Sequence, residues 1–284
     1  MKASRARLRE LMARDRPVVA PFVYDGLTAK LAEAAGFEAV YMTGFGTAAA
    51  RGFPDLGLLT LSEMVCNVTT LVRAVEVPVV CDADTGYGNP INVWRTVREY
   101  EDAGAAALHI EDQVWPKRCG FMAGKQVVPI ETMLAKVRAA VDARLDPALV
   151  IIARTDALAP HGWVEVERRA RAYRAAGADL IFVDGIITRQ DLEHYIGALG
   201  DLPLLYNGQL LPLPELLGFP LKLIIHTGTL FAAYARLRDA FKELKELGVV
   251  AGGAGFELLP EFARLMGAED VLNRQRRYQD GGQG

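Results

Sequence analysis

Short runs of apolar and β-branched residues recur along the chain, and each is followed by a longer amphipathic segment rich in Ala, Leu, Arg and Glu. This alternation is typical of β-strand and α-helix pairs that surround a parallel sheet. It predicts eight strands, at residues 18–24, 39–43, 77–81, 107–111, 150–154, 180–183, 204–206 and 222–226. Eight such units favour an α/β fold of the (β/α)8 or TIM-barrel type.

The segments between the strands have helical periodicity, which predicts helices at residues 27–35, 61–75, 92–103, 130–143, 163–176, 189–199 and 229–247. Three of these end in Ala-Gly, at Gly36, Gly104 and Gly177, where glycine adopts the left-handed conformation that ends a helix. The glycine-rich stretch 248–255 is predicted to be a linker, and 257–266 one more helix. We therefore expect a barrel domain over residues 1–247 and a linker with a C-terminal helix and tail over 248–284.

The composition suits a large buried core and a near-neutral surface. The chain has 284 residues, of which 51% are hydrophobic, and its 32 Lys and Arg balance 35 Asp and Glu, which favours neither a nucleic-acid nor a membrane partner. The sequence shows neither an apolar signal-peptide core nor an apolar run approaching the roughly 18 residues of a membrane span. The three cysteines are an odd number and show no CxxC-type pairing, which favours reduced thiols and a cytoplasmic protein. Cys66 and Cys81 are predicted to be packed core thiols.

Polar residues follow the end of each predicted strand. Because all strand C-termini of a barrel open on one face, where active sites of this architecture lie, these side chains are expected to converge. For Asp25, Asp112 and Asp156 taken singly, a helix N-cap or a turn is an equally good interpretation. The set as a whole predicts a functional site, and it consists of Asp25, Thr43, Asp82, Asp84, Glu111, Asp112, Arg154, Asp156, Asp184, Asn207, His226 and Thr227.

The segment Asp82-Ala83-Asp84-Thr85-Gly86-Tyr87-Gly88 predicts a metal site. Two carboxylates on a strand end, followed by a glycine-rich turn, can present oxygens to Mg²⁺ or Mn²⁺, and Glu111 from the next strand can complete the site through water. The alternative is that Asp84 caps the turn and Asp82 pairs with Arg154. Three carboxylates at one mouth repel each other without a cation, so we favour the metal.

Cys119 lies in Lys117-Arg118-Cys119-Gly120, within a polar stretch, residues 113–129, that predicts a loop of the kind that often forms a lid. Two adjacent cations lower the pKa of a thiol, so Cys119, with Lys117 beside it, is a candidate catalytic residue that exchanges protons. The alternative is a solvated basic loop with an incidental thiol. Arg154 can bind a carboxylate in bidentate fashion, or pair with the acidic cluster. His109, in mid-strand, is predicted to be a core histidine.

With these motifs in order, the chain resembles the isocitrate lyase and phosphoenolpyruvate mutase superfamily over about residues 5–247. The resemblance implies a modified (β/α)8 barrel, Mg²⁺ as cofactor with Mn²⁺ as its alternative, and small 2-oxo or 2-hydroxy acid substrates. It also implies a homotetramer, a dimer of dimers, with a C-terminal helix swapped between subunits. The matching segments are Tyr41-Met42-Thr43-Gly44, Pro54-Asp55-Leu56-Gly57, residues 82–88, Glu111-Asp112-Gln113, Pro116-Lys117-Arg118-Cys119-Gly120 and Ala153-Arg154-Thr155-Asp156-Ala157.

The resemblance also implies a role for individual residues. Asp82 and Asp84 would hold Mg²⁺, with Asp55 and Glu111 acting through water. Arg154 would bind the substrate, and Asp184 and Asn207 are expected to contact it from neighbouring strand ends. The substrate carboxylate would be held by Thr43, Gly44 and Phe45, and the closing lid would be formed by Cys119 and Gly120.

Several positions depart from the family pattern. Thr43 stands where Ser is common, Phe121 where His usually follows Cys-Gly, and Asp184 where Glu is usual. The segment after Asn207 is short and apolar where the family has a Glu-containing, glycine-rich loop. A shortened loop removes polar partners for a distal carboxylate, so an altered substrate pocket is expected.

These observations predict a Mg²⁺-dependent lyase that cleaves a carbon–carbon bond in a small 2-hydroxy or 2-oxo dicarboxylate, such as a substituted malate or oxaloacetate. Cys119 would protonate the carboxylate enolate that cleavage leaves. Three alternatives stay open: an oxaloacetate decarboxylase, an enzyme acting on phosphonate P–C bonds, and a catalytically silent ligand-binding homologue. The sequence does not assign roles to His226 and Thr227.

Overall fold

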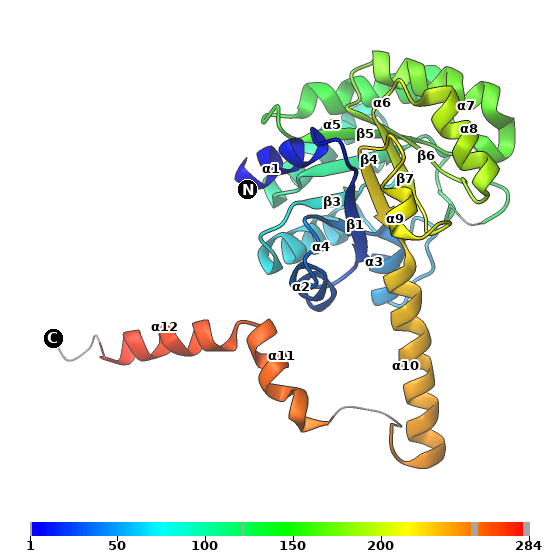
Figure 1. The fold of residues 1–284 in the computed structure, drawn as a ribbon. Helices are drawn as coiled ribbons and strands as arrows, with labels where there is room; N and C mark the ends of the chain where they lie inside the picture. Colours follow the sequence, from blue (N-terminus) through cyan, green and yellow to red (C-terminus); the bar gives the residue numbers. More distant parts are fainter. Residues whose placement is uncertain (1, 121, 251–254, 281–284) are drawn as a thin grey trace. The chain divides into compact units, whose positions relative to one another are not determined.

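Eight parallel strands close into a barrel in chain order, with β1 hydrogen-bonded to both β2 and β8 (Figure 1). The structure is a computed structural model that describes residues 2–120, 122–250 and 255–280. The predicted (β/α)8 barrel is confirmed, and each strand begins and ends within two residues of its predicted bounds. The strands are β1 (Val18–Val23), β2 (Val40–Met42), β3 (Val79–Asp82), β4 (Ala107–Glu111), β5 (Val150–Thr155), β6 (Leu180–Val183), β7 (Leu204–Asn207) and β8 (Leu223–His226).

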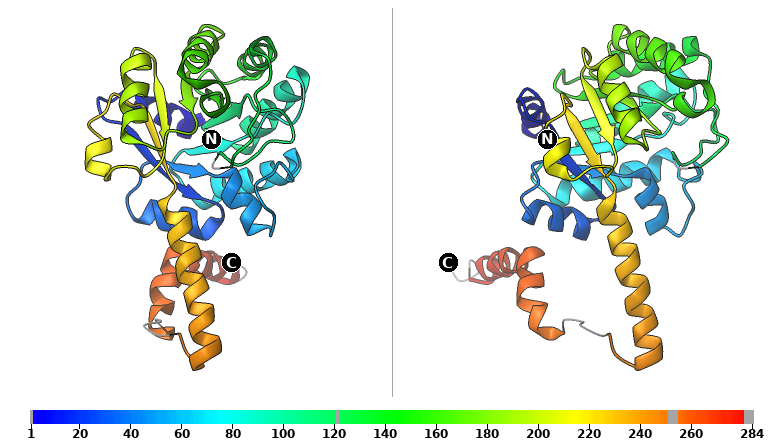
Figure 2. Two further views of the ribbon diagram at one scale, coloured as in Figure 1. Left: turned by 90° about the vertical axis from the view of Figure 1, so that its right-hand side faces the viewer. Right: turned by 45° about the vertical axis from the view of Figure 1, so that its right-hand side comes forward.

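Helices form the outer layer around these strands (Figure 2). Helices α1 (Lys2–Met12) and α3 (Gly44–Ala50) were not predicted. The buried residues of α1 are only Arg5, Leu8 and Leu11, and α3 is a short glycine- and alanine-rich segment. The predicted helices are present as α2 (Gly26–Ala34), α4 (Leu61–Ala74), α5 (Pro90–Ala103), α6 (Ile130–Ala143), α7 (Leu158–Ala175), α8 (Arg189–Leu199) and α10 (Gly228–Leu247), with a short α9 (Leu213–Leu216) before β8.

Helix ends follow the predicted chemistry. Gly36, Gly104 and Gly177 have φ of 88°, 99° and 106°, which confirms them as left-handed residues at helix C-termini. Asp25 is the N-cap of α2, since its Oδ1 accepts a hydrogen bond from the Thr28 amide at 2.7 Å. Asp25 is therefore structural, and the polar residues of interest at the strand ends begin with Thr43.

The buried apolar residues form two layers, one inside the barrel and one between the strands and the helices. Cys81 lies in the outer layer and is fully buried, as predicted. The prediction for Cys66 was wrong, because its side chain is exposed. On α4 the buried face consists of Met64, Asn67, Val68 and Leu71. Cys66 follows Met64 by two residues, about 200° around the helix, and so faces away from the core.

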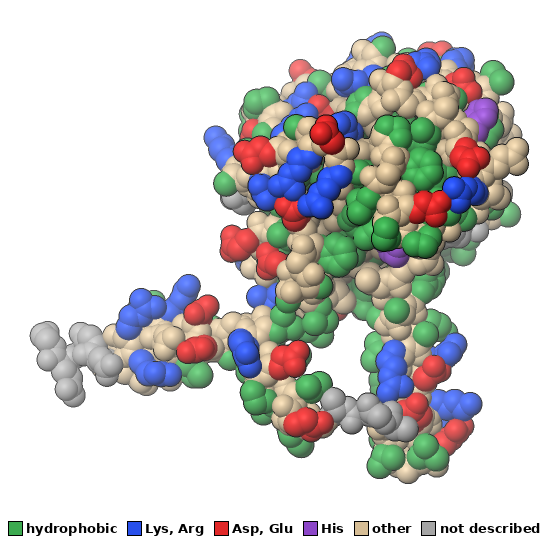
Figure 3. All heavy atoms as spheres, in the orientation of Figure 1, with side chains coloured by type: hydrophobic (Ala, Val, Ile, Leu, Met, Phe, Trp, Pro, Cys, Tyr) green, Lys and Arg blue, Asp and Glu red, His purple; other side chains and the backbone are tan. Residues whose placement is uncertain are grey.

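The chain divides into two compact units, Met1–Leu230 and Phe231–Gly284. The second unit contains most of α10, a 3₁₀ turn η1 (Phe256–Leu258), α11 (Leu259–Leu265) and α12 (Ala268–Asp280). The helix predicted at 257–266 is thus present as η1 and α11, whereas α12 was not predicted. Residues 251–254 of the predicted linker lie outside the described residues. Hydrophobic side chains are exposed along these helices (Figure 3), among them Tyr234, Leu237, Phe241 and Leu244 on α10.

In the part of the chain that the structure describes, no helix combines the length and the apolar character needed to cross a bilayer.

Candidate functional site

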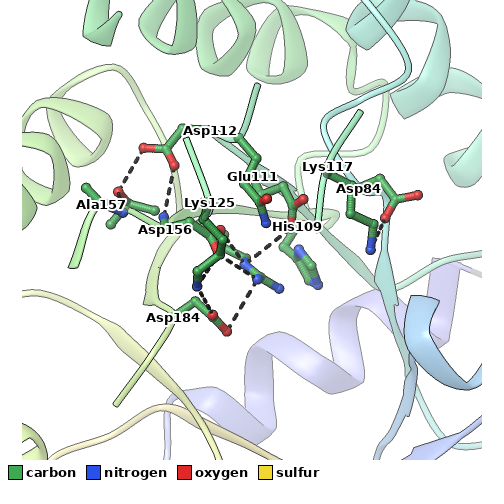
Figure 4. Close-up of polar contacts among 12 residues, drawn as sticks. Asp84, His109, Glu111, Asp112, Lys117, Lys125, Asp156, Ala157 and Asp184 are labelled. Atoms are coloured by element: carbon green, nitrogen blue, oxygen red, sulfur yellow. Dashed lines mark hydrogen bonds and ion pairs between the residues drawn. The ribbon is translucent and has the colours of Figure 1, made fainter. Parts of the chain in front are cut away.

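The C-terminal ends of β3 to β6 bring a cluster of charged side chains to one mouth of the barrel (Figure 4). The cluster is buried although it is charged, and it consists of Asp82, Asp84, Glu111, Asp112, Arg154, Asp156 and Asp184. Two lysines from the loop after β4, Lys117 and Lys125, extend into it and are also buried. Buried charges need partners, so the pairing of these groups defines what the site can do.

Asp82 is fixed by the chain around it. Its Oδ1 accepts from the Asp84 amide at 2.9 Å, and its Oδ2 accepts from the Gly44 amide at 3.2 Å and from the Tyr41 hydroxyl at 3.5 Å. A Cβ on Gly44 would lie 2.6 Å from Asp82 Oδ2, so only glycine allows this approach. Burial acts to raise the pKa of Asp82, but His109 and then Lys117 outweigh it and hold the pKa below its ordinary value.

Lys117 joins Asp55 and Asp84, because its Nζ contacts Asp55 Oδ1 and lies 2.9 Å from Asp84 Oδ1. Burial raises the pKa of Asp84 to about 6, with Lys117 opposing this shift and Asp82 adding to it. Burial acts to lower the pKa of Lys117, yet Asp84, Glu111 and further carboxylates raise it well above its ordinary value. Lys117 is therefore a cation at neutral pH, and its ammonium lies among the carboxylates that the sequence assigned to the metal.

The carboxylates fit a partly hydrated hard cation. Burial raises the pKa of Glu111 well above its ordinary value, and Glu111 Oε1 is buried and accepts no hydrogen bond within the described residues. Such an oxygen is costly to bury unless a cation or a water-linked cation uses it. Across residues 2–120, 122–250 and 255–280, no three His, Cys, Asp or Glu side chains form a ready-made metal cluster. A site where water completes the coordination is the arrangement that Mg²⁺ prefers.

Arg154 is held by three carboxylates. Its Nε and Nη2 donate to the two oxygens of Asp156, each at 2.9 Å, and the guanidinium also pairs with Glu111 and Asp184 at 3.3 Å. The predicted pairing with the acidic cluster is confirmed, but the alternative pair between Asp82 and Arg154 is absent from the described ion pairs. Nη1 donates no hydrogen bond within the described residues, so this edge of Arg154 can receive a substrate carboxylate.

Cys119 lies in the loop that follows β4, and its residue is only 6% exposed. The base of the loop is closed by a hydrogen bond from the Val114 amide to the Gln126 carbonyl at 2.8 Å. The neighbouring Arg118 is exposed and donates to the Ala123 carbonyl at 3.0 Å, while Lys117 pairs with carboxylates. The described partners of these two cations are thus a backbone carbonyl and carboxylates. Their effect on the thiol stays a prediction. Phe121 lies outside the described residues.

Lys125 is the residue of this loop that the sequence interpretation missed. Its Nζ donates to Asp156 Oδ1 at 2.9 Å and to Asp184 Oδ2 at 2.8 Å. Gly120 lies against the same carboxylate, since a Cβ on it would be 2.5 Å from Asp184 Oδ2. A signal was present in the sequence: so many carboxylates at strand ends require more cations than Arg154 alone, and the loop contains Lys117, Arg118 and Lys125.

The remaining predicted residues line the other strand ends. Thr43 is the N-cap of α3, with its Oγ1 accepting from the Gly46 amide at 3.2 Å, so Gly44 and Phe45 form the first turn of that helix. Asn207 ends β7, and its Oδ1 is buried without a hydrogen bond among the described residues. His226 Nδ1 accepts from the Gly228 amide at 3.2 Å, and burial lowers the pKa of His226.

His109 is a core histidine, as predicted. Its Nε2 is 2.7 Å from the Tyr41 hydroxyl, and burial lowers the pKa of His109 to about 4, so the ring is neutral at pH 7. Tyr41 was missed as a site residue, although it opens one of the motifs that carried the resemblance and directly precedes the end of β2. It is buried against Asp82 and His109 and forms a hydrogen bond with each of them.

A closed (β/α)8 barrel that gathers carboxylates, an arginine and a loop cysteine at the C-terminal ends of its strands has the architecture of a barrel enzyme. A family model described as phosphoenolpyruvate phosphomutase matches residues 8–245. The chain belongs to the isocitrate lyase and phosphoenolpyruvate mutase superfamily, which confirms the resemblance.

Relatives match over nearly the whole chain. The chain is 41% identical to 2,3-dimethylmalate lyase of Eubacterium barkeri, over 97% of this chain and 98% of that protein. A solved structure of oxaloacetate acetylhydrolase with the inhibitor 3,3-difluorooxalacetate is 36% identical and superposes with a TM-score of 0.90, covering 100% of this chain and 98% of that one. A structure of phosphonopyruvate hydrolase with oxalate and Mg²⁺ is 30% identical, with a TM-score of 0.87 over 97% and 99% of the two chains.

Proposed function

We propose that the protein is a Mg²⁺-dependent lyase that cleaves a carbon–carbon bond in a small 2-hydroxy or 2-oxo dicarboxylate, of the substituted malate or oxaloacetate type. The observation that supports it most strongly is the buried Cys119 in a loop whose lysines pair with carboxylates at the barrel mouth. The names of the relatives agree, since the chain covers nearly all of 2,3-dimethylmalate lyase and of oxaloacetate acetylhydrolase.

In this proposal some residues of the mouth bind the substrate and others move protons. The Nη1 edge of Arg154 binds a substrate carboxylate, and the first turn of α3, with Thr43, Gly44 and Phe45, holds the other end of the oxo-acid. In a 2-hydroxy substrate, or in the hydrate of a 2-oxo substrate, a carboxylate of the mouth takes the proton of the 2-hydroxyl as its carbon becomes a carbonyl. The electron pair of the broken carbon–carbon bond stays on the departing carboxylate fragment as an enolate. Cys119 donates its thiol proton to the α-carbon of that enolate, while the loop above the site excludes water.

The proposed metal ligands are Asp82 and Asp84, with Asp55 and Glu111 acting through water. Bound Mg²⁺ supplies Lewis-acid stabilisation of negative charge on the substrate oxygens. The Lys117 ammonium already lies 2.9 Å from Asp84 Oδ1, so it and a divalent cation compete for the same carboxylates. Treatment with EDTA should abolish turnover, and added Mg²⁺ or Mn²⁺ should restore it. Full activity in the chelator would refute the metal assignment.

The test of the activity is a turnover screen of substituted malates, 2-methylisocitrate and oxaloacetate with Mg²⁺, with products resolved by NMR. Cys119→Ser should lower kcat by about 10²-fold or more, the scale of a lost general acid, with little change in Mg²⁺ affinity. Cys66→Ser is the matched control, because that thiol is exposed on α4 and should leave kcat unchanged. Turnover of oxaloacetate that survives Cys119→Ser would favour the decarboxylase, and release of phosphate from phosphonopyruvate in ³¹P NMR would favour a phosphonate enzyme.

We also propose a homotetramer built through the second compact unit. Leu230, Tyr234, Leu237, Phe241 and Leu244 recur on α10 at alternating spacings of four and three, the pattern of a helix that packs against another helix. Phe241 is 68% exposed within the single chain. A continuous stripe of exposed apolar side chains of this kind marks a surface that binds another protein chain. Light scattering should give the mass of four chains, and Phe241→Glu should reduce it. A parent protein that elutes as a monomer would contradict this assembly.

A further inference from the structure

Lys125 and Lys117 pair with carboxylates on different sides of the barrel mouth (Figure 4). Lys117 pairs with Asp55 and Asp84, and Asp84 lies two residues beyond the end of β3. Lys125, further along the same loop, pairs with Asp156 and Asp184, which follow β5 and β6. The two lysines therefore tie the loop that contains Cys119 to both sides of the mouth.

The two attachments differ in which other groups contact the carboxylates that the lysines bind. The Lys117 pair uses Asp84, a proposed metal ligand, so a bound divalent cation weakens that attachment. The Lys125 pair uses Asp156 and Asp184, whose other oxygens bind Arg154 at 2.9 Å and 3.3 Å. Lys125 and Arg154 balance the charges of these two carboxylates, and Arg154 also pairs with Glu111 at 3.3 Å. Among the described ion pairs, Lys117 therefore contacts a proposed metal ligand directly and Lys125 does not.

The contact between Gly120 and Asp184 links the Lys125 ion pair to the Cys119 thiol. The Gly120 backbone lies against Asp184 so closely that a Cβ would be 2.5 Å from its Oδ2, the oxygen that accepts from Lys125. Asp184 thus contacts the loop immediately after Cys119 and again at Lys125. The Lys125 ammonium is buried, so each of its two charge-assisted hydrogen bonds is protected from water.

We propose that Lys125 is a positioning residue that sets the placement of the Cys119 thiol and couples it to Arg154 through the shared carboxylates of Asp156 and Asp184. The role of this thiol in catalysis rests on the proposed function, but its placement does not. The position of Cys119 can be measured without substrate, metal or turnover, from the rate at which iodoacetamide alkylates it. Alkylation of a buried thiol reports how often the loop moves away from the site.

The experiment uses the full chain with Cys66→Ser as background, since Cys66 is exposed and Cys81 is fully buried. Lys125→Met removes the ammonium but keeps the length of the side chain, and should raise the alkylation rate of Cys119 by about fivefold or more, the scale of one coupled buried pair. Lys125→Arg keeps the charge and should restore most of the protection. Peptide mass spectrometry assigns the alkylated cysteine.

Lys136→Met is the matched control for general destabilisation. Lys136 is also a buried lysine, but it lies on α6 and donates to the Thr85 carbonyl at 2.8 Å, outside the Cys119 loop. It should lower the thermal midpoint while leaving Cys119 alkylation within about twofold of the background. Equal acceleration by Lys136→Met and Lys125→Met would overturn the inference, as would an unchanged rate in Lys125→Met.

Asp184→Asn removes the same ion pair from its other partner, so it keeps the inference testable if Lys125→Met is unstable. Where both variants fold, a double-mutant cycle tests the coupling. Asp184→Asn and Lys125→Met should each accelerate alkylation, and the double variant should be no faster than the faster single variant, because both remove one interaction. Strictly multiplicative rates would refute the coupling. If the protein shows this pattern but turns over no acid in the screen, the role of Lys125 is supported and the lyase proposal is refuted. If the protein is an active lyase without this pattern, the lyase proposal is supported and the role of Lys125 is refuted.

Discussion

Asp112 offers the sharpest test of how the barrel holds the strand that bears Arg154. Its carboxylate accepts from the Thr155 hydroxyl at 2.8 Å, the Asp156 amide at 2.9 Å and the Tyr173 hydroxyl at 2.7 Å. It also pairs with Arg169 at 2.9 Å. Asp112 is fully buried, and it ties β4 to the end of β5 and to α7. The sequence left its role open between a cap and a site residue, and these contacts show that it is structural.

The cost of Asp112→Ala follows from the donors it leaves without an acceptor. Thr155, Asp156 and Tyr173 each lose a buried partner, at about 1–2 kcal/mol apiece. Arg169 keeps the Glu165 carboxylate and a backbone carbonyl, so it is not left unpaired. Burial and then the charge of Asp156 raise the pKa of Asp112, so removing the buried charge returns part of the loss. The free energy of unfolding should therefore fall by about 3 kcal/mol.

Urea unfolding followed by tryptophan fluorescence and circular dichroism measures this loss. All three tryptophans lie in the unit Met1–Leu230, so their fluorescence reports on the barrel. Asp112→Asn keeps one carbonyl oxygen as acceptor and should lie between parent and Asp112→Ala. Asp201→Ala removes an exposed ion pair with Arg171 and should leave the midpoint unchanged. A loss below about 1 kcal/mol in Asp112→Ala would show that the four contacts do not hold the strands together.

Three further outcomes follow from single contacts. Gly120→Ala places a Cβ 2.5 Å from Asp184 Oδ2. It should lower kcat/KM by about tenfold or more with an unchanged circular dichroism spectrum. Parent-like kinetics would show that the loop does not need the close contact between residue 120 and Asp184. Burial acts to raise the pKa of Asp156, but its cationic partners outweigh burial and lower the pKa below the ordinary value. The stabilisation that the Asp156 carboxylate gives is therefore present above about pH 4 and is lost as the pH falls through the pKa of the folded state. Asp156→Asn should therefore lower the urea midpoint most at neutral pH and progressively less below pH 4, and a pH-independent difference would contradict this. A thiol reagent should modify Cys66 at once in the folded protein and Cys81 only after unfolding, and early loss of the Cys81 thiol would contradict its burial.

The strands and the location of the site could be predicted from local patterns. The bounds of β4 and β6 agree residue for residue, because both strands are fully buried and mostly apolar, and a charged residue stands where each apolar run stops, Glu111 in β4 and Asp184 after β6. The positive φ at Gly104 agrees for a similarly local reason, since a helix C-terminus needs only its own residues to form. The convergence of Asp82, Glu111 and Arg154 also followed, because chain order alone fixes where strand C-termini open in a barrel.

The sequence by itself therefore determined the barrel, its ligand-facing mouth and the residue types gathered there, since these depend on periodicity and on the direction of the strands. Only the tertiary structure decided which charges pair. Lys117 and Asp55 are 62 residues apart and Lys125 and Asp184 are 59 apart, and no local pattern favours one partner over another. Electrostatic partners are chosen by distance and burial after folding, and these choices turned a basic loop into a segment attached to both sides of the mouth.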